Sequence, residues 1–143
     1  EEVGILRHSI TKRITINTEL AGDLPAIEGD PTQLDQVIMN ICLNGVQAMT
    51  GKGTLAILTE AVSSDQISKS VDINPSVKTY VVLSVADTGR GMDSVTLERI
   101  FEPFFTTKGT GEGTGLGLST VYGIVANHGG SISVESMIEK GTT

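Results

Sequence analysis

The residues most able to do chemistry lie between positions 87 and 118. All three phenylalanines of the chain fall within five positions there, at 101, 104 and 105. Glycines then alternate with other residues at positions 109, 111, 113, 115 and 117. Alternate glycines let backbone amides approach a ligand closely. The ladder runs into an apolar stretch that predicts a helix, and free amides at a helix start bind phosphate. The segment therefore predicts a nucleotide-binding site.

Asp87 is the candidate for recognising the base of such a nucleotide. It continues the parity of Val81, Leu83 and Val85 along a predicted strand, so its carboxylate is directed to the buried side. Burial there is costly unless the carboxylate gains a hydrogen-bonding partner. A carboxylate accepts a bond from the exocyclic amine of adenine and repels the carbonyl of guanine, which favours ATP over GTP. The alternative is a turn at residues 87–89 that only caps the strand.

A predicted helix over residues 31–49 carries a second group of polar side chains. Asp30 before Pro31 predicts its start. Projection at about 100° per residue leaves a narrow uncharged stripe on an otherwise apolar helix. The stripe consists of Gln33, Gln36, Asn40, Asn44 and Gln47. It either lines a cavity, where amide oxygens suit a hard cation such as Mg²⁺, or it faces solvent. The helix alone does not decide between these two interpretations.

The elements that must position these groups alternate between strand and helix patterns. Strands are predicted over residues 11–20, 54–61, 79–86 and 131–136, and helices over 31–49, 94–100 and 116–127. A polar loop over 62–78 separates the two middle strands. We expect an α+β fold, a two-layer sandwich in which about three helices pack on one face of a mixed, mostly antiparallel sheet. We expect one domain over 1–143, with residues 1–10 ending a helix from a preceding domain and the final strand truncated.

Composition excludes several classes of protein. With 143 residues, 38% hydrophobic and 19% charged, the chain is typical of one globular domain. A net charge of −7 argues against nonspecific binding of nucleic acid. No apolar run is long enough to cross a membrane, so we expect no direct membrane contact. The single cysteine, Cys42, suits a reducing compartment. The glycines fit neither the P-loop nor the dinucleotide-binding pattern.

Four blocks, in this order, resemble the ATP-binding catalytic domain of sensor histidine kinases, which has the Bergerat fold of the superfamily shared with gyrase and MutL. The blocks are AsnIleCysLeuAsnGlyValGlnAla (40–48), AspThrGlyArgGlyMet (87–92), PheGluProPhePheThrThrLys (101–108) and GlyThrGlyLeuGlyLeu (113–118). They match the N, G1, F and G2 boxes of that family. HisGlyGly at 128–130 and LysGlyThrThr at 140–143 are also similar to it, so the resemblance covers nearly the whole chain.

The resemblance implies roles for individual residues. Asn44 would hold Mg²⁺, Asp87 would bind adenine, and Lys108 would reach the terminal phosphates. The F box and the glycines after it would form a mobile lid. The implied nucleotide-binding residues are Asn44, Gln47, Asp87, Gly89, Gly91, Met92, Phe104, Thr107, Lys108, Gly113, Thr114, Gly115, Leu116, Gly117 and Leu118. Some family members have a lysine that faces the phosphates where this chain has Gln47, which implies modest affinity.

Asn40 and Lys108 are the implied catalytic residues, and Asn40 separates kinases from ATPases within the superfamily. ATP-hydrolysing members carry a glutamate four residues before the Mg²⁺-holding asparagine, to activate water. Asn40 cannot take a proton at neutral pH, so we expect slow hydrolysis and transfer of the γ-phosphoryl group to another acceptor. The alternatives are an ATPase or an anti-sigma-factor-like serine kinase of the same superfamily, and a module that binds nucleotide or a partner without catalysis.

Neither histidine of the chain matches a phosphoacceptor. His8 lacks the acidic neighbour and the later proline that the family usually shows, so we expect a surface residue. His128 lies at a predicted helix end before two glycines, where it suits the helix dipole. The resemblance therefore implies a phosphoacceptor histidine on a separate dimerisation domain of the same parent protein. It also implies a downstream response regulator and a cytoplasmic location, whether or not the parent is membrane-anchored.

Overall fold

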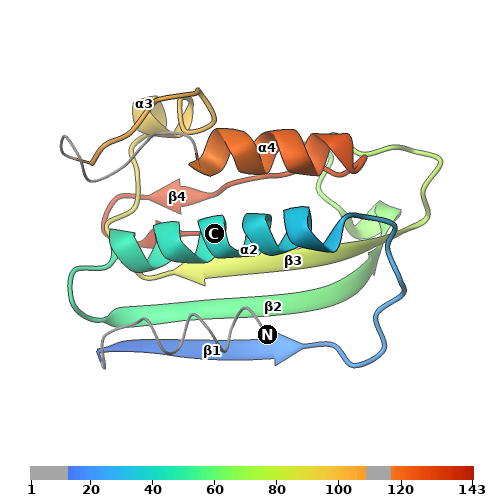
Figure 1. The fold of residues 1–143 in the computed structure, drawn as a ribbon, viewed down its shortest axis with the longest axis horizontal. Helices are drawn as coiled ribbons and strands as arrows, with labels where there is room; N and C mark the ends of the chain where they lie inside the picture. Colours follow the sequence, from blue (N-terminus) through green and yellow to red (C-terminus); the bar gives the residue numbers. More distant parts are fainter. Residues whose placement is uncertain (1–12, 109–116) are drawn as a thin grey trace.

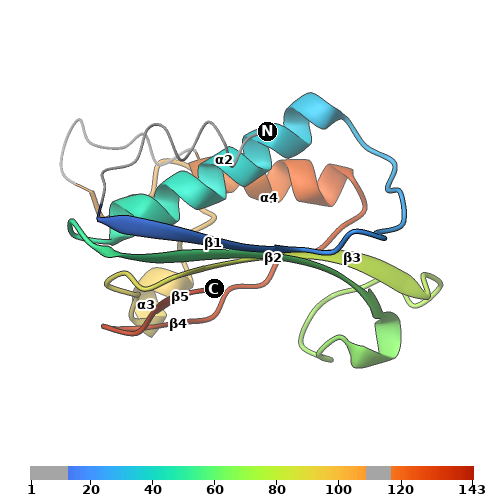
Figure 2. The same ribbon diagram turned by 90° about the horizontal axis from the view of Figure 1, so that it is seen from below.

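A computed structural model of the chain describes residues 13–108 and 117–143 as two packed layers. A five-stranded sheet has the strand order β1-β2-β3-β5-β4, and two long helices, α2 and α4, lie on one of its faces (Figures 1 and 2). The elements are β1 (Ile14–Leu20), α2 (Pro31–Ala48), β2 (Gly53–Ser63), η1 (Ser64–Gln66), β3 (Thr79–Asp87), α3 (Ser94–Leu97), α4 (Gly117–Asn127), β4 (Ser136–Met137) and β5 (Gly141–Thr142).

The sheet is mixed and mostly antiparallel, as predicted. β1 pairs with β2 in parallel, whereas β2 with β3, β3 with β5 and β4 with β5 are antiparallel. The register places Asp87 opposite Leu55 of β2 on one side and Thr142 of β5 on the other. The last residue of β3 therefore has a strand neighbour on both sides.

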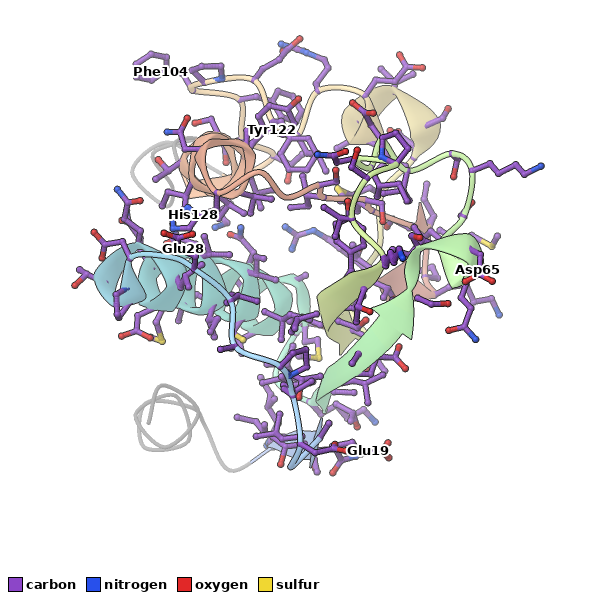
Figure 3. All side chains as sticks on the ribbon, turned by 90° about the vertical axis from the view of Figure 1, so that its right-hand side faces the viewer. Glu19, Glu28, Asp65, Phe104, Tyr122 and His128 are labelled. Atoms are coloured by element: carbon purple, nitrogen blue, oxygen red, sulfur yellow. The ribbon has the colours of Figure 1, made fainter. Side chains whose placement is uncertain are left out.

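Helix α2 begins as the sequence predicts. The Asp30 side chain accepts hydrogen bonds from the amides of Thr32 and Gln33, at 2.9 and 3.3 Å, and Pro31 occupies the first turn. Far along the chain, His128 accepts the Asp30 amide on Nε2 at 3.0 Å, and its Nδ1 lies 2.8 Å from the Ile124 carbonyl. This imidazole joins the end of α4 to the start of α2, and Figure 3 shows it between the two helices.

The core has two parts, one on each side of α2. Between α2 and the sheet lie Cys42, Met49, Leu55 and Ile57. Between α2 and α4 lie Val37, Val121 and Ile124. Burial raises the pKa of the Cys42 thiol to about 11. Because α2 contributes to both clusters, its position relative to the sheet and to α4 is set by apolar packing.

Two predicted elements differ from the structure. The helix predicted over 94–100 is the single turn α3, because the following residues form successive tight turns, with Arg99 N bonded to Thr96 O and Glu102 N to Arg99 O. The strand predicted over 131–136 is also wrong over most of its length. Exposure alternates along it as in a strand, but only its end is paired. Glu135 and Thr143 exchange backbone hydrogen bonds at 2.9 and 2.8 Å, and Ser136–Met137 pairs with Gly141–Thr142. A strand needs a hydrogen-bonded neighbour, and β5 supplies one only at its end.

The remaining predictions concern the loop after β2, the N-terminal residues, the glycine ladder and membrane spans. β2 extends to Ser63, so the predicted polar loop begins later and opens with η1. The predicted helix end at 1–10 and most of the glycine ladder lie outside the described residues. Among the helices of the described residues, none has the length and hydropathy of a membrane span.

Candidate functional site

Asp87 lies at the end of β3 with its carboxylate on the helix side of the sheet. A Cβ built on Gly45 of α2 would lie 3.4 Å from Asp87 Cβ and 3.5 Å from Oδ2. The other oxygen, Oδ1, accepts the amide of Gly89 at 2.8 Å. The turn that the sequence offers as the alternative is therefore present, and recognition of a base by Asp87 stays a prediction. One oxygen closes a turn, and the other faces the helix.

Two opposing influences act on the ionisation of Asp87, namely its burial and its neighbouring polar and charged groups. Burial raises the pKa of the Asp87 carboxyl, and this effect outweighs the others. The backbone amides of Gly89 and Thr142 and the positive charge of Arg90 act in the lowering direction. A half-buried carboxylate held by amides is directed and costly to charge, which is typical of a recognition group.

The turn after Asp87 is wedged between the end of α2 and the β4–β5 hairpin. Gly89 is buried, and a Cβ there would lie 2.7 Å from Ala48 O. The next amide, of Arg90, donates to the same Ala48 carbonyl at 3.0 Å. At Gly91, where φ is +64°, a Cβ would lie 2.0 Å from Met137 O. Both glycines of the predicted site are thus required by close backbone contact.

The amide stripe of α2 divides into two parts. Asn40 and Asn44 are half-buried, whereas Gln33, Gln36 and Gln47 are exposed. Asn40 Nδ2 donates to the carbonyl of Gly117, the first residue of α4, at 3.3 Å. The inner amides therefore lie on the side of α2 that meets α4, and the outer ones face solvent.

The chemistry of the inner amides fits a hydrated hard cation. The described residues contain no group of three or more His, Cys, Asp or Glu side chains able to hold a metal. Mg²⁺ usually keeps several waters and needs only one or two protein oxygens beside substrate phosphates. Asn44, one residue before the Gly45 that faces Asp87, carries such an oxygen, and its binding of Mg²⁺ stays a prediction.

Lys108 and Gln47 are hydrogen-bonded at the C-terminal end of the amide stripe. The Lys108 ammonium donates to Gln47 Oε1, and the Lys108 amide donates to Thr106 Oγ1 at 3.0 Å. Gly117 and Leu118 form the first turn of α4 and are half-buried. The Lys108 ammonium and the start of α4 at Gly117 thus both contact amide side chains of α2, at Gln47 and Asn40.

Other predicted site residues are not brought to Asp87 in this structure. Phe104 is 75% exposed with φ of +66°, and Figure 3 shows it at the periphery of the molecule. Thr107 is exposed. Phe101 instead packs against Tyr122, with ring centroids 5.3 Å apart and the ring planes tilted by 45°. Gly113, Thr114, Gly115 and Leu116 lie outside the described residues.

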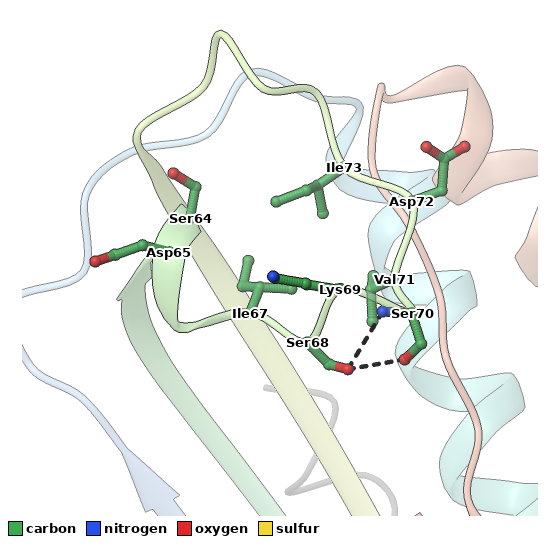
Figure 4. Close-up of a pocket in the computed structure, with 9 residues that line it drawn as sticks. All are labelled: Ser64, Asp65, Ile67, Ser68, Lys69, Ser70, Val71, Asp72 and Ile73. Carbon is green, nitrogen blue, oxygen red and sulfur yellow. Dashed lines mark hydrogen bonds between the residues drawn. The ribbon is translucent and has the colours of Figure 1, made fainter.

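A shallow hollow at the opposite end of β3 is a poor candidate for the site. It is formed by one loop and lined by Ser64, Asp65, Ile67, Ser68, Lys69, Ser70, Val71, Asp72 and Ile73 (Figure 4). Its polar groups bond to one another, as Ser68 Oγ does to Ser70 Oγ at 2.8 Å. β3 separates it from Asp87 by roughly 27 Å, at about 3.4 Å per residue.

Sequence reasoning assigned no role to several residues that surround Asp87. Gly45 lies within the block at 40–48, and the sequence predicts no role for it. Gly141 and Thr142 belong to the LysGlyThrThr motif, which was noted without a function, and a Cβ at Gly141 would lie 1.9 Å from Asp87 O. Ser136 bonds the amide of Met92 at 2.9 Å. The LysGlyThrThr motif was the sequence feature that could have indicated Gly141 and Thr142. Its contact with Asp87, however, follows only from the fold.

Comparison with known proteins identifies the class. The family model described as histidine kinase-, DNA gyrase B- and HSP90-like ATPase matches residues 29–143. The chain therefore belongs to this family of ATP-binding domains. The resemblance stated from the four sequence blocks is confirmed.

The relatives of the chain specify the type of domain within that family. Sensor kinase CckA of Brucella abortus is 40% identical over 97% of this chain and 15% of its own length. Sensor histidine kinase ZraS of Escherichia coli K12 is 39% identical over 84% and 22%. The chain is thus of the sensor histidine kinase catalytic type, and it spans less than a quarter of the length of these relatives.

Solved structures agree with the fold. The catalytic domain of histidine kinase ThkA has a TM-score of 0.73 at 29% identity, covering 99% of this chain and 82% of that one. The mycobacterial sensor histidine kinase MprB has a TM-score of 0.74 at 23% identity, over 99% and 84%. The second likeness bears on the fold alone, and both have the mixed sheet with helices that the sequence predicted.

Proposed function

We propose that this chain binds Mg²⁺·ATP and transfers its γ-phosphoryl group to a histidine on a separate dimerisation domain of the same parent protein. The observation that carries the proposal is the Asp87 carboxylate, which is half-buried at a strand end and faces Gly45 of α2, the residue after Asn44. Family membership and the two sensor kinase relatives support it. The proposal extends to a cytoplasmic location and a response regulator as the downstream partner.

Recognition of the base rests on Asp87 and the two glycines after it. Asp87 accepts a hydrogen bond from the exocyclic amine of adenine through the oxygen that faces α2. Guanine presents a carbonyl at that position, and two acceptors repel each other. Gly89 and Gly91 carry no side chain that would obstruct a flat ring, and their backbone packs against the end of α2 and the hairpin. These contacts select ATP over GTP.

The phosphates belong on the other side of Asn44, between α2 and the start of α4. Asn44 would hold Mg²⁺, which neutralises phosphate charge when bound. The Lys108 ammonium donates a hydrogen bond to Gln47 of the same amide stripe. It would bind the terminal phosphates. The remaining nucleotide contacts proposed for Met92, Phe104, Thr107, Leu118 and residues 113–117 need closure of the F box and the glycines over the ligand.

Asn40 favours phosphoryl transfer over hydrolysis. Its amide donates to Gly117 O, and an amide cannot accept a proton at neutral pH. Water near the γ-phosphate therefore lacks a general base at this position. The imidazole nitrogen of the acceptor histidine attacks the γ-phosphorus, a P–N bond forms, and the P–O bond to ADP breaks. Positioning and charge neutralisation supply the catalysis.

The binding half of the proposal is tested by calorimetric titration of the chain with ATP and GTP, with and without Mg²⁺. We expect Mg²⁺-dependent binding of ATP and at least tenfold weaker binding of GTP, the factor set by one mismatched hydrogen bond. Asn44→Ala should remove the Mg²⁺ dependence. The matched control is Gln36→Ala, an exposed amide on the same helix, which should bind as the wild type does. Equal affinity for ATP and GTP would refute the role of Asp87.

The transfer half is tested with γ-labelled ATP. The chain alone should not label itself, whereas an added dimerisation domain from the parent protein should become labelled at its histidine. Labelling of His8 in the isolated chain would overturn the assignment of the acceptor. Release of inorganic phosphate faster than labelling of the acceptor would favour an ATPase instead.

A further inference from the structure

The Ser136 hydroxyl occupies a position between the turn after Asp87 and the β4–β5 hairpin. It accepts the amide of Met92 at 2.9 Å, donates to the Gly141 carbonyl at 3.1 Å, and lies 2.7 Å from the Thr142 hydroxyl. A serine has one proton to donate and two lone pairs. Since the proton goes to Gly141, the Thr142 hydroxyl donates to Ser136. All three bonding positions of this side chain are therefore used.

The backbones that Ser136 joins are also interlocked by close contact. Glu139 N donates to Arg90 O at 2.8 Å. A Cβ on Gly91 would collide with Met137 O, and one on Gly141 would collide with Asp87 O. The hairpin therefore touches the turn at both ends, and Ser136 lies inside this contact as its side-chain link to Met92.

This contact reaches the base-recognition group itself. Thr142 lies opposite Asp87 in the sheet, and its amide favours the charged form of the Asp87 carboxyl by lowering its pKa. The pairing of β3 with β5 is limited to this one register position in the described residues. Displacement of the hairpin would therefore move the strand neighbour of Asp87 and the backbone of Gly91 together.

We propose that Ser136 is a positioning residue for purine recognition, because its hydroxyl fixes the β4–β5 hairpin against the turn that follows Asp87. It touches neither nucleotide nor metal in this proposal. It acts by holding the amide of Thr142 and the Gly91–Met92 backbone where Asp87 needs them. The inference rests on the proposed binding of ATP at Asp87 and goes beyond it, since no sequence motif assigned a role to this serine.

The test compares Ser136→Ala, which removes all three hydrogen bonds, with Ser136→Thr, which keeps a hydroxyl and suits a strand. Ser133→Ala is the matched control, because Ser133 is exposed on the same segment. Calorimetry measures the affinity of each variant for Mg²⁺·ATP and Mg²⁺·GTP. Thermal unfolding followed by circular dichroism shows whether each variant is folded. If Ser136→Ala does not fold, Ser136→Cys takes its place, since a thiol of similar size is only a weak donor and acceptor.

We expect Ser136→Ala to weaken ATP binding by about tenfold and to reduce the preference for ATP over GTP by a similar factor. Ser136→Thr should restore most of that preference, and Ser133→Ala should match the wild type. An unchanged preference, including equal weakening of ATP and GTP binding, would overturn the inference. A hydroxyl that only stabilises the fold should affect the binding of both nucleotides equally. A wild type that binds no nucleotide would instead refute the proposed function itself.

Discussion

Gly89→Ala adds a single methyl group where the turn after Asp87 meets the end of α2. The new Cβ would lie 2.7 Å from Ala48 O and 2.7 Å from Asp87 Oδ1. The carbonyl belongs to the backbone of a helix that packs in both core clusters, so it cannot rotate away as a side-chain end can. The turn must move instead. That movement breaks the bond from Arg90 N to Ala48 O, which is 3.0 Å long.

The expected cost follows from two contributions. Forcing a methyl group into a packed contact costs about 1–3 kcal/mol, and the lost hydrogen bond costs roughly 1 kcal/mol. We therefore expect the free energy of unfolding to fall by about 2–4 kcal/mol. Because Asp87 Oδ1 bonds the amide of Gly89, displacement of the turn should also weaken ATP binding by more than tenfold.

Gly123→Ala in α4 is the matched control for this substitution. A Cβ at Gly123 would meet no atom within 4 Å, and alanine is favoured over glycine in a helix by about 1 kcal/mol. Urea unfolding followed by circular dichroism should therefore show opposite signs for the two variants. A Gly89→Ala variant as stable as the wild type, with unchanged ATP affinity, would show that the turn does not press on Ala48.

Three further substitutions or probes test single contacts. Because burial raises the pKa of Asp87, the folded chain binds this proton more tightly than the unfolded chain. Its contribution to stability therefore grows as the pH falls through the folded pKa, and at pH 7 the charge is a cost. Asp87→Asn should thus unfold at an equal or higher temperature than the wild type while losing its preference for ATP, whereas a clear loss of stability would contradict the direction of the shift. His128→Ala removes the bond to the Asp30 amide and should lower the free energy of unfolding by about 1–2 kcal/mol in urea titration. An unchanged value would mean that the imidazole does not join the helices. Cys42 is 1% exposed with a pKa of about 11, so a thiol reagent at pH 8 should react only after unfolding, and rapid reaction of the native chain would contradict its burial.

Local patterns predicted the parts of the molecule that depend on local physics. The parity of β3 placed Asp87 on the helix side because strand side chains alternate between faces. Asp30 and Pro31 predicted the start of α2 because an aspartate accepts hydrogen bonds from the orphan amides of a helix start and a proline, which has no N–H, leaves one fewer of them to satisfy. The uncharged stripe on α2 was also predicted. Its division into half-buried and exposed amides was not, because that depends on where α4 lies.

Long-range pairing accounts for what the sequence did not reveal. The link from Ser136 to Met92 spans 44 positions, and nothing in the residues around Ser136 indicates its partner. The incorrect strand prediction over 131–136 has the same cause. An alternating pattern shows which side chains share a face, but it does not show which strand lies beside them. The sequence also gives no position for the Phe104 ring, which is 75% exposed. Its contact with a nucleotide stays a prediction.

Asp87 is held by two kinds of contact, and the difference between them explains how one residue can be both stable and selective. On the side of α2 and β2 its neighbours are Gly45 and Leu55, the latter fully buried in the core. That side fixes the end of β3 by apolar packing, which is strong but not directional. On the side of β5 the contacts are the strand pairing with Thr142 and the close approach of Gly141 to the Asp87 carbonyl. These contacts fix the Asp87 backbone, while the amide of Gly89, in the turn against which the hairpin packs, fixes Oδ1. The proposed discrimination between purines therefore depends on the hairpin, whereas the free energy of folding depends on the core.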